Sequence, residues 1–153
     1  MATAFAIYDF RFGFLKIGYD GDTVLSIDKV EDSSDSGIKT AFSDHVFSEI
    51  DEYLRGKRKS FDFKYRLEGP QFQLKIWNAL ERIPYGETRS YKEIAEEIGC
   101  PKACRAVGMA NHANPVMIAV PCHRVIGANG SLTGYGGGIE MKKALLELEK
   151  SNR

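Results

Sequence analysis

The stretch SYKEIAEEIGCPKACRAVGMANHANP, residues 90–115, decides the fold that the chain is expected to adopt. Ser90 and Glu93 form a capping-box signal at the start of a first helix, and Gly99 is a typical helix end. Pro101 can open a second helix directly afterwards, and both helices carry apolar residues at positions i, i+3, i+4 and i+7. The two apolar stripes consist of Tyr91, Ile94, Ala95 and Ile98, and of Ala103, Ala106, Val107 and Ala110. This pattern predicts a helix-turn-helix.

The sequence on either side of this motif extends it into a winged-helix-like domain. Upstream, Phe72, Ile76 and Leu80 line one face of a predicted helix. Downstream, MIAVPCHRVIGANGSLTGYGGG (residues 117–138) alternates short β-prone runs with glycine turns, which is typical of a wing. A last helix is expected from about residue 139 to 150.

The N-terminal part of the chain indicates a sheet with one helix. FGFLKIGYD (12–20) and TVLSIDKV (23–30) are rich in β-branched and aromatic residues and flank an Asp-Gly-Asp turn, which predicts a hairpin. Residues 41–54 repeat apolar side chains every four positions and predict a helix, while FDFKYRL (61–67) predicts a closing strand. We therefore expect an α+β chain with a sheet-and-helix domain over residues 1–68 and a second domain over residues 69–153.

Composition and charge narrow the range of functions. The 153 residues carry no net charge, although residues 1–70 hold 10 basic against 13 acidic side chains and residues 71–153 hold 11 against 8. A mildly basic C-terminal half permits contact with polyanions. No apolar run approaches the ~18 residues of a membrane span. Three cysteines and no secretory signal at the N-terminus favour a reducing compartment, so we expect a cytoplasmic protein without disulfides.

Cys122 and His123 form the candidate reactive centre. A nucleophilic cysteine needs a base, but neighbours on an extended segment point to opposite faces, so a bend or a water must connect the two. Glu149 lies on the same face of the last helix as Leu145 and Leu146, where the core should be. A buried carboxylate needs a partner, and a histidine is a suitable one. These residues outline a relay in which Glu149 orients His123 and His123 takes the proton of Cys122.

Other interpretations of these residues stay open at this point. In a non-catalytic interpretation, Cys122 is a cysteine of the core and His123 is a histidine at the surface. Glu149 is then a solvated residue at the end of the last helix. The basic run RGKRK (55–59) either touches a phosphate backbone or forms a solvated loop, and His45 falls off the helical stripe as a surface residue. The Cys100–Cys104 spacing lacks the second tight pair of a zinc site, so no metal is expected.

The motifs PCHRVIG, RAVGMANHANP and SLTGYGGG closely resemble those of the O6-alkylguanine-DNA alkyltransferases, which are also called methylated-DNA–protein-cysteine methyltransferases. The resemblance is dense from about Phe72 to Glu149 and only architectural in residues 1–66, where it implies a ribonuclease-H-like antiparallel sheet with a helix. It implies a DNA repair protein that is a monomer, that binds alkylated double-stranded DNA through the minor groove and that uses no cofactor, while cooperative binding to DNA stays open.

The resemblance assigns roles on the DNA side to the second helix of the helix-turn-helix. Arg105 would enter the base stack in place of an extruded nucleotide, because an atom inside a duplex is inaccessible to an enzyme until the base is flipped out. The small side chains of Ala106 and Ala110 would let this helix approach the DNA closely.

The resemblance also implies a base pocket near Tyr91, Val125 and Tyr135. Main-chain groups around Cys122 and Val125 would read the edge of the base. The N–H of Gly136 would reach O6, although some relatives have a serine there and its hydroxyl is lost here. Lys142 matches a family position near the tyrosine, and Tyr91 would help to place a proton on the leaving guanine.

The implied reaction is a single irreversible transfer of the alkyl group from O6-alkylguanine to Cys122, with O4-alkylthymine as a second expected substrate. His123 and Glu149 would supply the thiolate, and Asn114 would hold the turn around the site. The N-terminal domain has no cysteine and one histidine, His45, so we predict no zinc there. Two other functions stay open: a damage-sensing binder without transfer, and a cysteine hydrolase that turns over.

Overall fold

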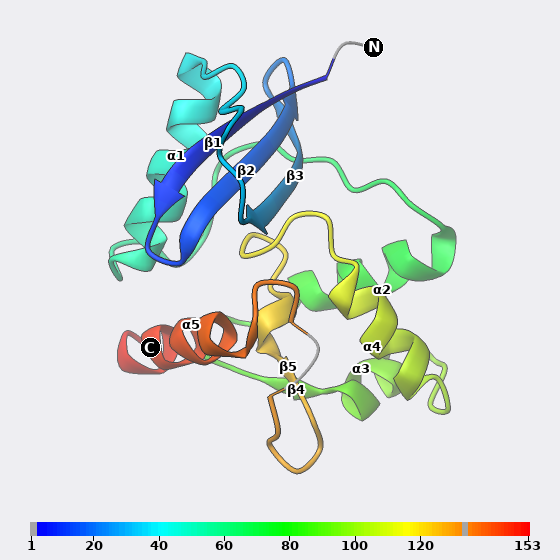
Figure 1. Ribbon diagram of the computed structural model, residues 1–153. Coiled ribbons are helices and arrows are strands. Elements are labelled where there is room, and N and C mark those ends of the chain that lie inside the picture. Colours follow the sequence, from blue (N-terminus) through cyan, green and yellow to red (C-terminus); the bar gives the residue numbers. More distant parts are fainter. Residues whose placement is uncertain (1–2, 133–134) are drawn as a thin grey trace. The chain divides into compact units, whose positions relative to one another are not determined.

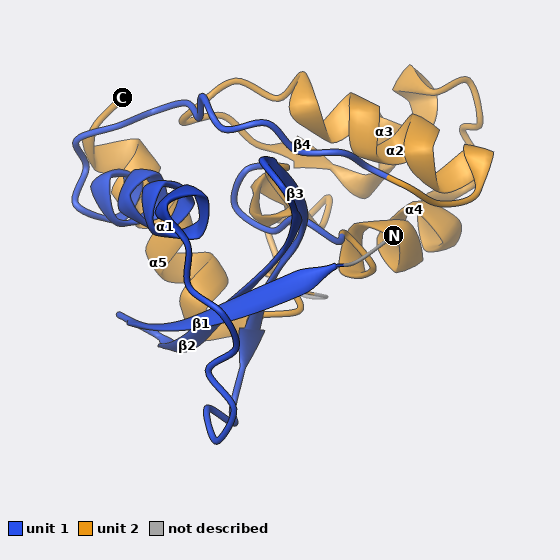
Figure 2. Cartoon of the chain, turned by 90° about the horizontal axis from the view of Figure 1, so that it is seen from above, with its two compact units in different colours: residues 1–67, 115–119 blue, residues 68–114, 120–153 orange. Residues whose placement is uncertain are grey.

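The computed structural model describes residues 3–132 and 135–153 (Figure 1). The described residues form a mixed α+β structure with a small antiparallel sheet and five α-helices. The chain divides into two compact units (Figure 2). The first contains the residues up to Leu67 together with Pro115–Ala119, and the second contains Glu68–Asn114 and Val120–Arg153.

The first unit is built on a three-stranded antiparallel sheet in the order β1-β2-β3 (Figure 1). Its strands are β1 (Ala4–Phe10), β2 (Gly13–Asp20) and β3 (Thr23–Val30). The predicted hairpin is present as β2 and β3, and Gly21 takes the positive φ of 60° that its tight turn requires. Alternate side chains of β2, Leu15, Ile17 and Tyr19, are buried, as expected for one face on a core.

Helix α1 (Ala41–Leu54) has the bounds that the periodicity predicts. Thr40 caps it, since its side chain accepts a hydrogen bond from the N–H of Ser43. The Tyr8 hydroxyl of β1 lies 2.8 Å from Ser43 Oγ and donates to Asp44 Oδ1 at 2.7 Å, and the Tyr8 ring stacks on Phe47. These contacts fix α1 against the sheet.

The prediction of a strand over residues 61–67 is wrong. Only Tyr65 pairs with β3, through an isolated bridge to Val24. The alternating aromatic side chains of this segment pack on one another instead: Phe61 on Phe63, and Phe63 on Tyr65. Further along, Val116 makes a second bridge to β3, at Ile27. It places Pro115–Ala119 in the first unit, a grouping that no sequence pattern indicates.

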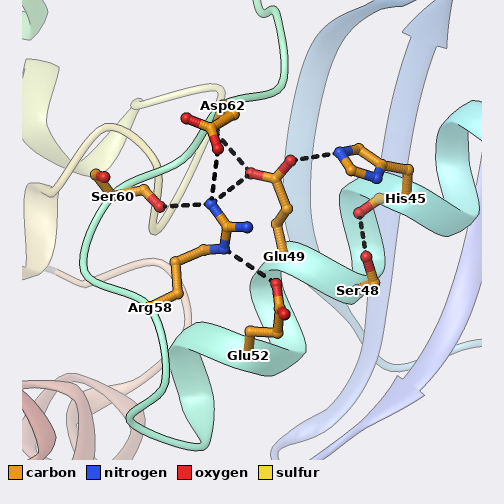
Figure 3. Close-up of polar contacts among 7 residues, drawn as sticks. All are labelled: His45, Ser48, Glu49, Glu52, Arg58, Ser60 and Asp62. Atoms are coloured by element: carbon orange, nitrogen blue, oxygen red, sulfur yellow. Dashed lines mark hydrogen bonds and ion pairs between the residues drawn. The ribbon is translucent and has the colours of Figure 1, made fainter.

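A buried carboxylate organises the end of α1 (Figure 3). Glu49 is 1% exposed, and its Oε1 accepts the N–H of Asp62 at 2.7 Å, while His45 Nε2 lies 2.6 Å from Oε2. Arg58 lies 3.4 Å from Glu49 and binds Glu52 at 3.1 Å. His45 is 60% exposed, as expected for a surface residue, and its ring lies beside the Glu49 carboxylate. Arg58, the second arginine of the RGKRK run, thus faces acidic side chains of its own unit.

The second unit is mainly helical. It contains α2 (Gln71–Glu81), α3 (Tyr91–Glu97), α4 (Cys104–His112), α5 (Ile139–Ser151) and the 3₁₀ helix η1 (Cys122–Arg124). The two-residue strands β4 (Arg89–Ser90) and β5 (Val125–Ile126) pair in parallel. Ser90 and Glu93 form the predicted capping box of α3. In the described residues no helix is both long and apolar enough to cross a bilayer.

Two details of this unit differ from the expectation. Helix α4 begins at Cys104 rather than at Pro101, because the residues before it form a turn in which the Ala103 N–H donates to the Cys100 carbonyl. After β5 the chain makes a tight turn in which Gly127 N–H donates to Ser131 O, rather than a series of strands. Residues 133–134 of the predicted wing lie outside the described residues.

The core of the second unit lies where α2, α3 and α4 meet. The buried Trp77 of α2 donates its Nε1–H to the Ala110 carbonyl of α4 at 2.8 Å. Burying a tryptophan is favourable only when its N–H keeps a partner, so this bond fixes α2 against α4. The other buried apolar side chains of the three helices are Ile76, Ala79, Leu80, Ile94, Ala95, Val107 and Ala110.

Candidate active site

Cys122 is the first residue of the 3₁₀ helix η1, directly after Pro121. The turn is closed by a hydrogen bond from Arg124 N–H to the Pro121 carbonyl at 3.0 Å. A 3₁₀ turn rotates successive side chains by about a third of a circle, whereas a strand points them to opposite faces. The local bend that a Cys–His pair requires is therefore present.

Burial sets the resting state of the thiol. Cys122 is 4% exposed, and this burial raises the pKa of its thiol to about 11. A hydrogen bond with Asn114 and the positive charge of Lys142 act in the opposite direction and lower the pKa. Because the burial effect is larger, Cys122 is a neutral thiol in the resting protein at pH 7.

A buried ion-pair network surrounds the next two residues. His123 Nε2–H donates to Glu149 Oε2 at 2.7 Å. Arg124 binds both oxygens of the same carboxylate, with Nε at 2.8 Å and Nη2 at 3.0 Å. Gly86 N–H donates to Glu149 at 3.1 Å, and Arg124 also donates to the Ile83 carbonyl at 2.6 Å. The carboxylate is thus held in one orientation from three sides.

His123 has no exposed surface, and burial lowers its pKa although the hydrogen bond with Glu149 acts to raise it. The imidazole is therefore neutral at pH 7. Because its Nε2–H is donated to Glu149, Nδ1 is the basic nitrogen of the ring. The sequence did not assign a role to Arg124, and its only signal was a charged residue within an otherwise apolar run, AVPCHRVI.

Two asparagines near the end of α4 hold the main chain on either side of Pro121. Asn114 Nδ2 donates to the Val120 carbonyl at 2.8 Å, and Asn111 Nδ2 donates to the Cys122 carbonyl at 3.2 Å. Both side chains are buried. Asn114 was among the expected site residues, whereas Asn111 was missed because it lies within the regular pattern of a helix.

Lys142 of α5 lies on the other side of the reactive segment. It is fully buried, its Nζ donates to the Val125 carbonyl, and it lies 6.0 Å from the ring centre of Tyr91. Burial lowers the pKa of Lys142 to about 8, while the nearby Cys122 acts to raise it. The structure therefore brings Tyr91, Val125 and Lys142 together as expected.

The remaining expected pocket residues follow the segment 133–134. Tyr135 is 6% exposed, and burial raises its pKa well above the usual range, with smaller contributions from Glu149 and from Cys122 once its thiol is ionised. Gly136 is exposed. The ionisation of Tyr135 is therefore electrostatically coupled to that of the Cys122 thiol.

The expected DNA-side residues lie on different faces of α4. Arg105 is exposed, and Ala106 is half-buried. Ala110 is only 2% exposed, and its main-chain carbonyl accepts the Nε1–H of Trp77 of α2. Met109, four residues after Arg105, is 69% exposed on the outer face.

Comparison with known proteins places this arrangement in a family. Residues 71–151 match the family model described as the DNA-binding domain of 6-O-methylguanine DNA methyltransferase. The curated methylated-DNA–protein-cysteine methyltransferase of Methanosarcina acetivorans is 60% identical over 103 residues, which are 67% of this chain and 66% of the relative. The inducible enzyme of that name from Bacillus subtilis is 64% identical over 67% of this chain and 57% of the relative. The matched region thus spans about two thirds or less of these relatives.

Solved structures resemble nearly the whole chain. The Mycobacterium tuberculosis OGT in complex with DNA has a TM-score of 0.89 at 45% identity, over 97% of this chain and 93% of that one. The M. tuberculosis O6-methylguanine methyltransferase has a TM-score of 0.88 at 42% identity, over 99% of this chain and 95% of that one. Because the family model matches more than half of its residues, the chain belongs to the 6-O-methylguanine DNA methyltransferase family.

Proposed function

We propose that this protein repairs DNA by transferring the alkyl group of O6-alkylguanine irreversibly to Cys122. The observation that carries the proposal is the buried Cys122 thiol in a 3₁₀ turn beside a histidine–glutamate pair. Family membership and the DNA-bound relative support it. A buried, neutral thiol is protected from oxidation and becomes a nucleophile only when the substrate is in place.

The transfer is a displacement at the alkyl carbon. His123 Nδ1 takes up the thiol proton through a water, and the Glu149 hydrogen bond stabilises the resulting imidazolium. The sulfur forms a bond to the carbon while the carbon–O6 bond breaks, and the electron pair goes to guanine. Tyr91 donates its hydroxyl proton to the leaving guanine, so that the base departs neutral. The thiol proton held by His123 then passes through water to the Tyr91 phenolate, which restores both side chains.

Other side chains support this step by position and charge. Lys142 stabilises the thiolate electrostatically, as its effect on the Cys122 pKa indicates. Asn114 holds the Val120 carbonyl and contacts the thiol, which keeps the reactive segment in its turn. Main-chain groups of Cys122 and Val125, the ring of Tyr135 and the N–H of Gly136 bind the base.

The DNA-binding part is the α3–α4 pair, acting as a helix-turn-helix within a winged-helix-like domain over residues 69–153. Arg105 on the exposed face of α4 enters the duplex through the minor groove and replaces the flipped nucleotide. The protein acts as a monomer on alkylated double-stranded DNA. Residues 1–68 form a ribonuclease-H-like scaffold domain around the sheet and α1 of the first unit.

The product is a thioether, which neither water nor a base cleaves readily, so each molecule reacts once. This stoichiometry distinguishes the proposal from a cysteine hydrolase, which releases its product and turns over. No cofactor takes part, because the cysteine itself accepts the alkyl group. O4-alkylthymine presents the same alkyl–oxygen bond and is a second substrate.

The test is the mass of the tryptic peptide that contains Cys122 after incubation with a duplex carrying one O6-methylguanine. We expect this peptide to gain one methylene group, in an amount equal to the DNA repaired. Cys122→Ala is the control, since it should bind the duplex and leave the lesion unrepaired. An unmodified Cys122 peptide beside repaired DNA, or repair in excess of the protein, would overturn the proposal.

A further inference from the structure

Asn111 is buried, and within the described residues only the Nδ2 of its side-chain amide makes a hydrogen bond. The residue is 1% exposed, and its Nδ2 donates to the Cys122 carbonyl at 3.2 Å. The other half, Oδ1, is buried too, and no donor within residues 3–132 and 135–153 reaches it. A buried acceptor without a donor costs roughly 1–3 kcal/mol, so such atoms in native proteins call for a specific explanation.

The orientation of the amide is fixed by its neighbour. The Cys122 carbonyl can only accept a hydrogen bond, so turning the amide round would set two acceptors against each other. Oδ1 shares its carbon with Nδ2 and therefore lies beside the same main-chain segment as the reactive cysteine. The site thus offers a hydrogen-bond acceptor next to the residue that must meet the damaged base.

The chemistry of the substrate identifies the donor. Alkylation at O6 removes the hydrogen from N1 of guanine, so the exocyclic 2-amino group is the only N–H donor left on the pairing edge of the base. O4-alkylthymine has lost its N3 hydrogen in the same way and has no amino group, so its pairing edge carries no donor. An acceptor at Asn111 therefore distinguishes the two lesions.

We propose that Asn111 is a specificity-determining residue, whose Oδ1 accepts a hydrogen bond from the 2-amino group of the flipped base and so favours O6-alkylguanine over O4-alkylthymine. The inference rests on the proposed transfer to Cys122. It is the bond to the Cys122 carbonyl that brings Asn111 to this position, so one amide both holds the reactive residue and reads the base.

The experiment measures single-turnover transfer to Cys122 from three duplexes that differ in one base: O6-methylguanine, O6-methylhypoxanthine, which lacks the amino group, and O4-methylthymine. The wild-type protein should react faster with O6-methylguanine than with O6-methylhypoxanthine. In Asn111→Leu this ratio should fall about tenfold, the factor that one hydrogen bond of ~1.4 kcal/mol supplies. The rates with the other two substrates should fall by a smaller factor that is the same for both, because the substitution also removes the hydrogen bond to the Cys122 carbonyl.

Asn114→Leu is the matched control. It removes an amide that holds the Val120 carbonyl on the other side of Pro121, so it should slow all three substrates by the same factor. An equal loss with all three substrates in Asn111→Leu would show a merely structural role and overturn the inference. Each ratio compares substrates on one preparation, so it is independent of the fraction of the variant that folds.

The wild-type protein alone also tests the inference, through its rates with the substrates that carry and lack the 2-amino group. Equal rates with O6-methylguanine and O6-methylhypoxanthine would overturn the role of Asn111 while leaving alkyl transfer to Cys122 intact. Transfer from none of the three duplexes would instead contradict the proposed function itself. Asn111→Ala, which removes the amide without adding volume, should reproduce the change in ratio of Asn111→Leu.

Discussion

His123 donates its Nε2–H to Glu149 Oε2 across 2.7 Å, and both side chains are almost completely buried. The same carboxylate neutralises the guanidinium of Arg124 at 2.8 Å. One acidic group therefore serves two purposes, since it orients a base and compensates a buried positive charge. Its removal is expected to affect the stability of the second unit as well as the chemistry of the site.

Glu149→Gln should lower the free energy of unfolding by about 3–5 kcal/mol, because it leaves Arg124 buried without a counter-charge. Urea denaturation at pH 7 measures the effect. The double variant Glu149→Gln/Arg124→Met should recover part of the loss, since it also removes the positive charge that Glu149 compensates. If Glu149→Gln lowered the free energy of unfolding by less than about 1 kcal/mol, Glu149 would not be the group that compensates the charge of Arg124.

The sequence correctly predicted those helices whose bounds are set by residues close together along the chain. The bounds of α1 and the capping box of α3 follow from apolar spacing and cap residues. The same reasoning failed for residues 61–67, where aromatic side chains that alternate as in a strand pack on one another instead.

The site divides in the same way. Glu149 was found because an acid on an apolar helix face requires a buried partner. Arg124 and Asn111 were missed, because their roles depend on contacts with α5 and with the Cys122 carbonyl that no spacing along the chain reveals. Glu49 lies on the buried face of α1, but its pairing with His45 was missed, because the carboxylate is also bound by Asp62 of the loop after the helix.

The thiol of Cys122 should alkylate slowly at neutral pH and faster as the pH rises towards 11. Its pKa is raised to about 11 by burial, so the thiolate fraction grows through this range without a plateau below pH 9. Iodoacetamide labelling followed by peptide mass analysis measures the rate at each pH. The partly exposed Cys100 and Cys104 provide internal references. A plateau near pH 7 would mean that the resting residue is already a thiolate.

Lys142→Met should stabilise the protein at pH 7 while slowing alkyl transfer. The folded state lowers the pKa of Lys142 from 10.5 to about 8, so it binds the proton more weakly than the unfolded chain, and stability is lost as the pH falls through that window. The substitution removes the unfavourable burial of this charge but also the favourable hydrogen bond to the Val125 carbonyl. The free energy of unfolding should therefore rise by about 1–2 kcal/mol. Denaturation at pH 7 and at pH 10 measures it, and the gain should shrink at the higher pH. An equal gain at both would exclude this origin.

Glu49→Leu should destabilise the first unit by about 1–3 kcal/mol, because the N–H of Asp62 loses its acceptor and Arg58 loses a buried partner. Thermal or urea unfolding measures the loss. Glu52→Gln is the control, since Glu52 is about half exposed, and it should change stability by less than about 0.5 kcal/mol. If the two variants lowered the free energy of unfolding equally, the burial of Glu49 would not be the reason for its contribution to stability.

Arg105→Ala should slow transfer from O6-methylguanine in a duplex while leaving transfer from the free base O6-benzylguanine unchanged. Arg105 is exposed near the start of α4, whereas Cys122 is buried, so we expect Arg105 to contribute to the extrusion of the base rather than to the displacement at carbon. Single-turnover rates with the two substrates separate these steps, and we expect a loss of about tenfold or more on the duplex alone. Lys102→Ala, which changes a neighbouring exposed charge, should weaken duplex binding modestly and reduce its salt dependence. If Arg105→Ala slowed both substrates alike, the arginine would act on the fold of the site, and another residue would have to fill the place of the flipped nucleotide.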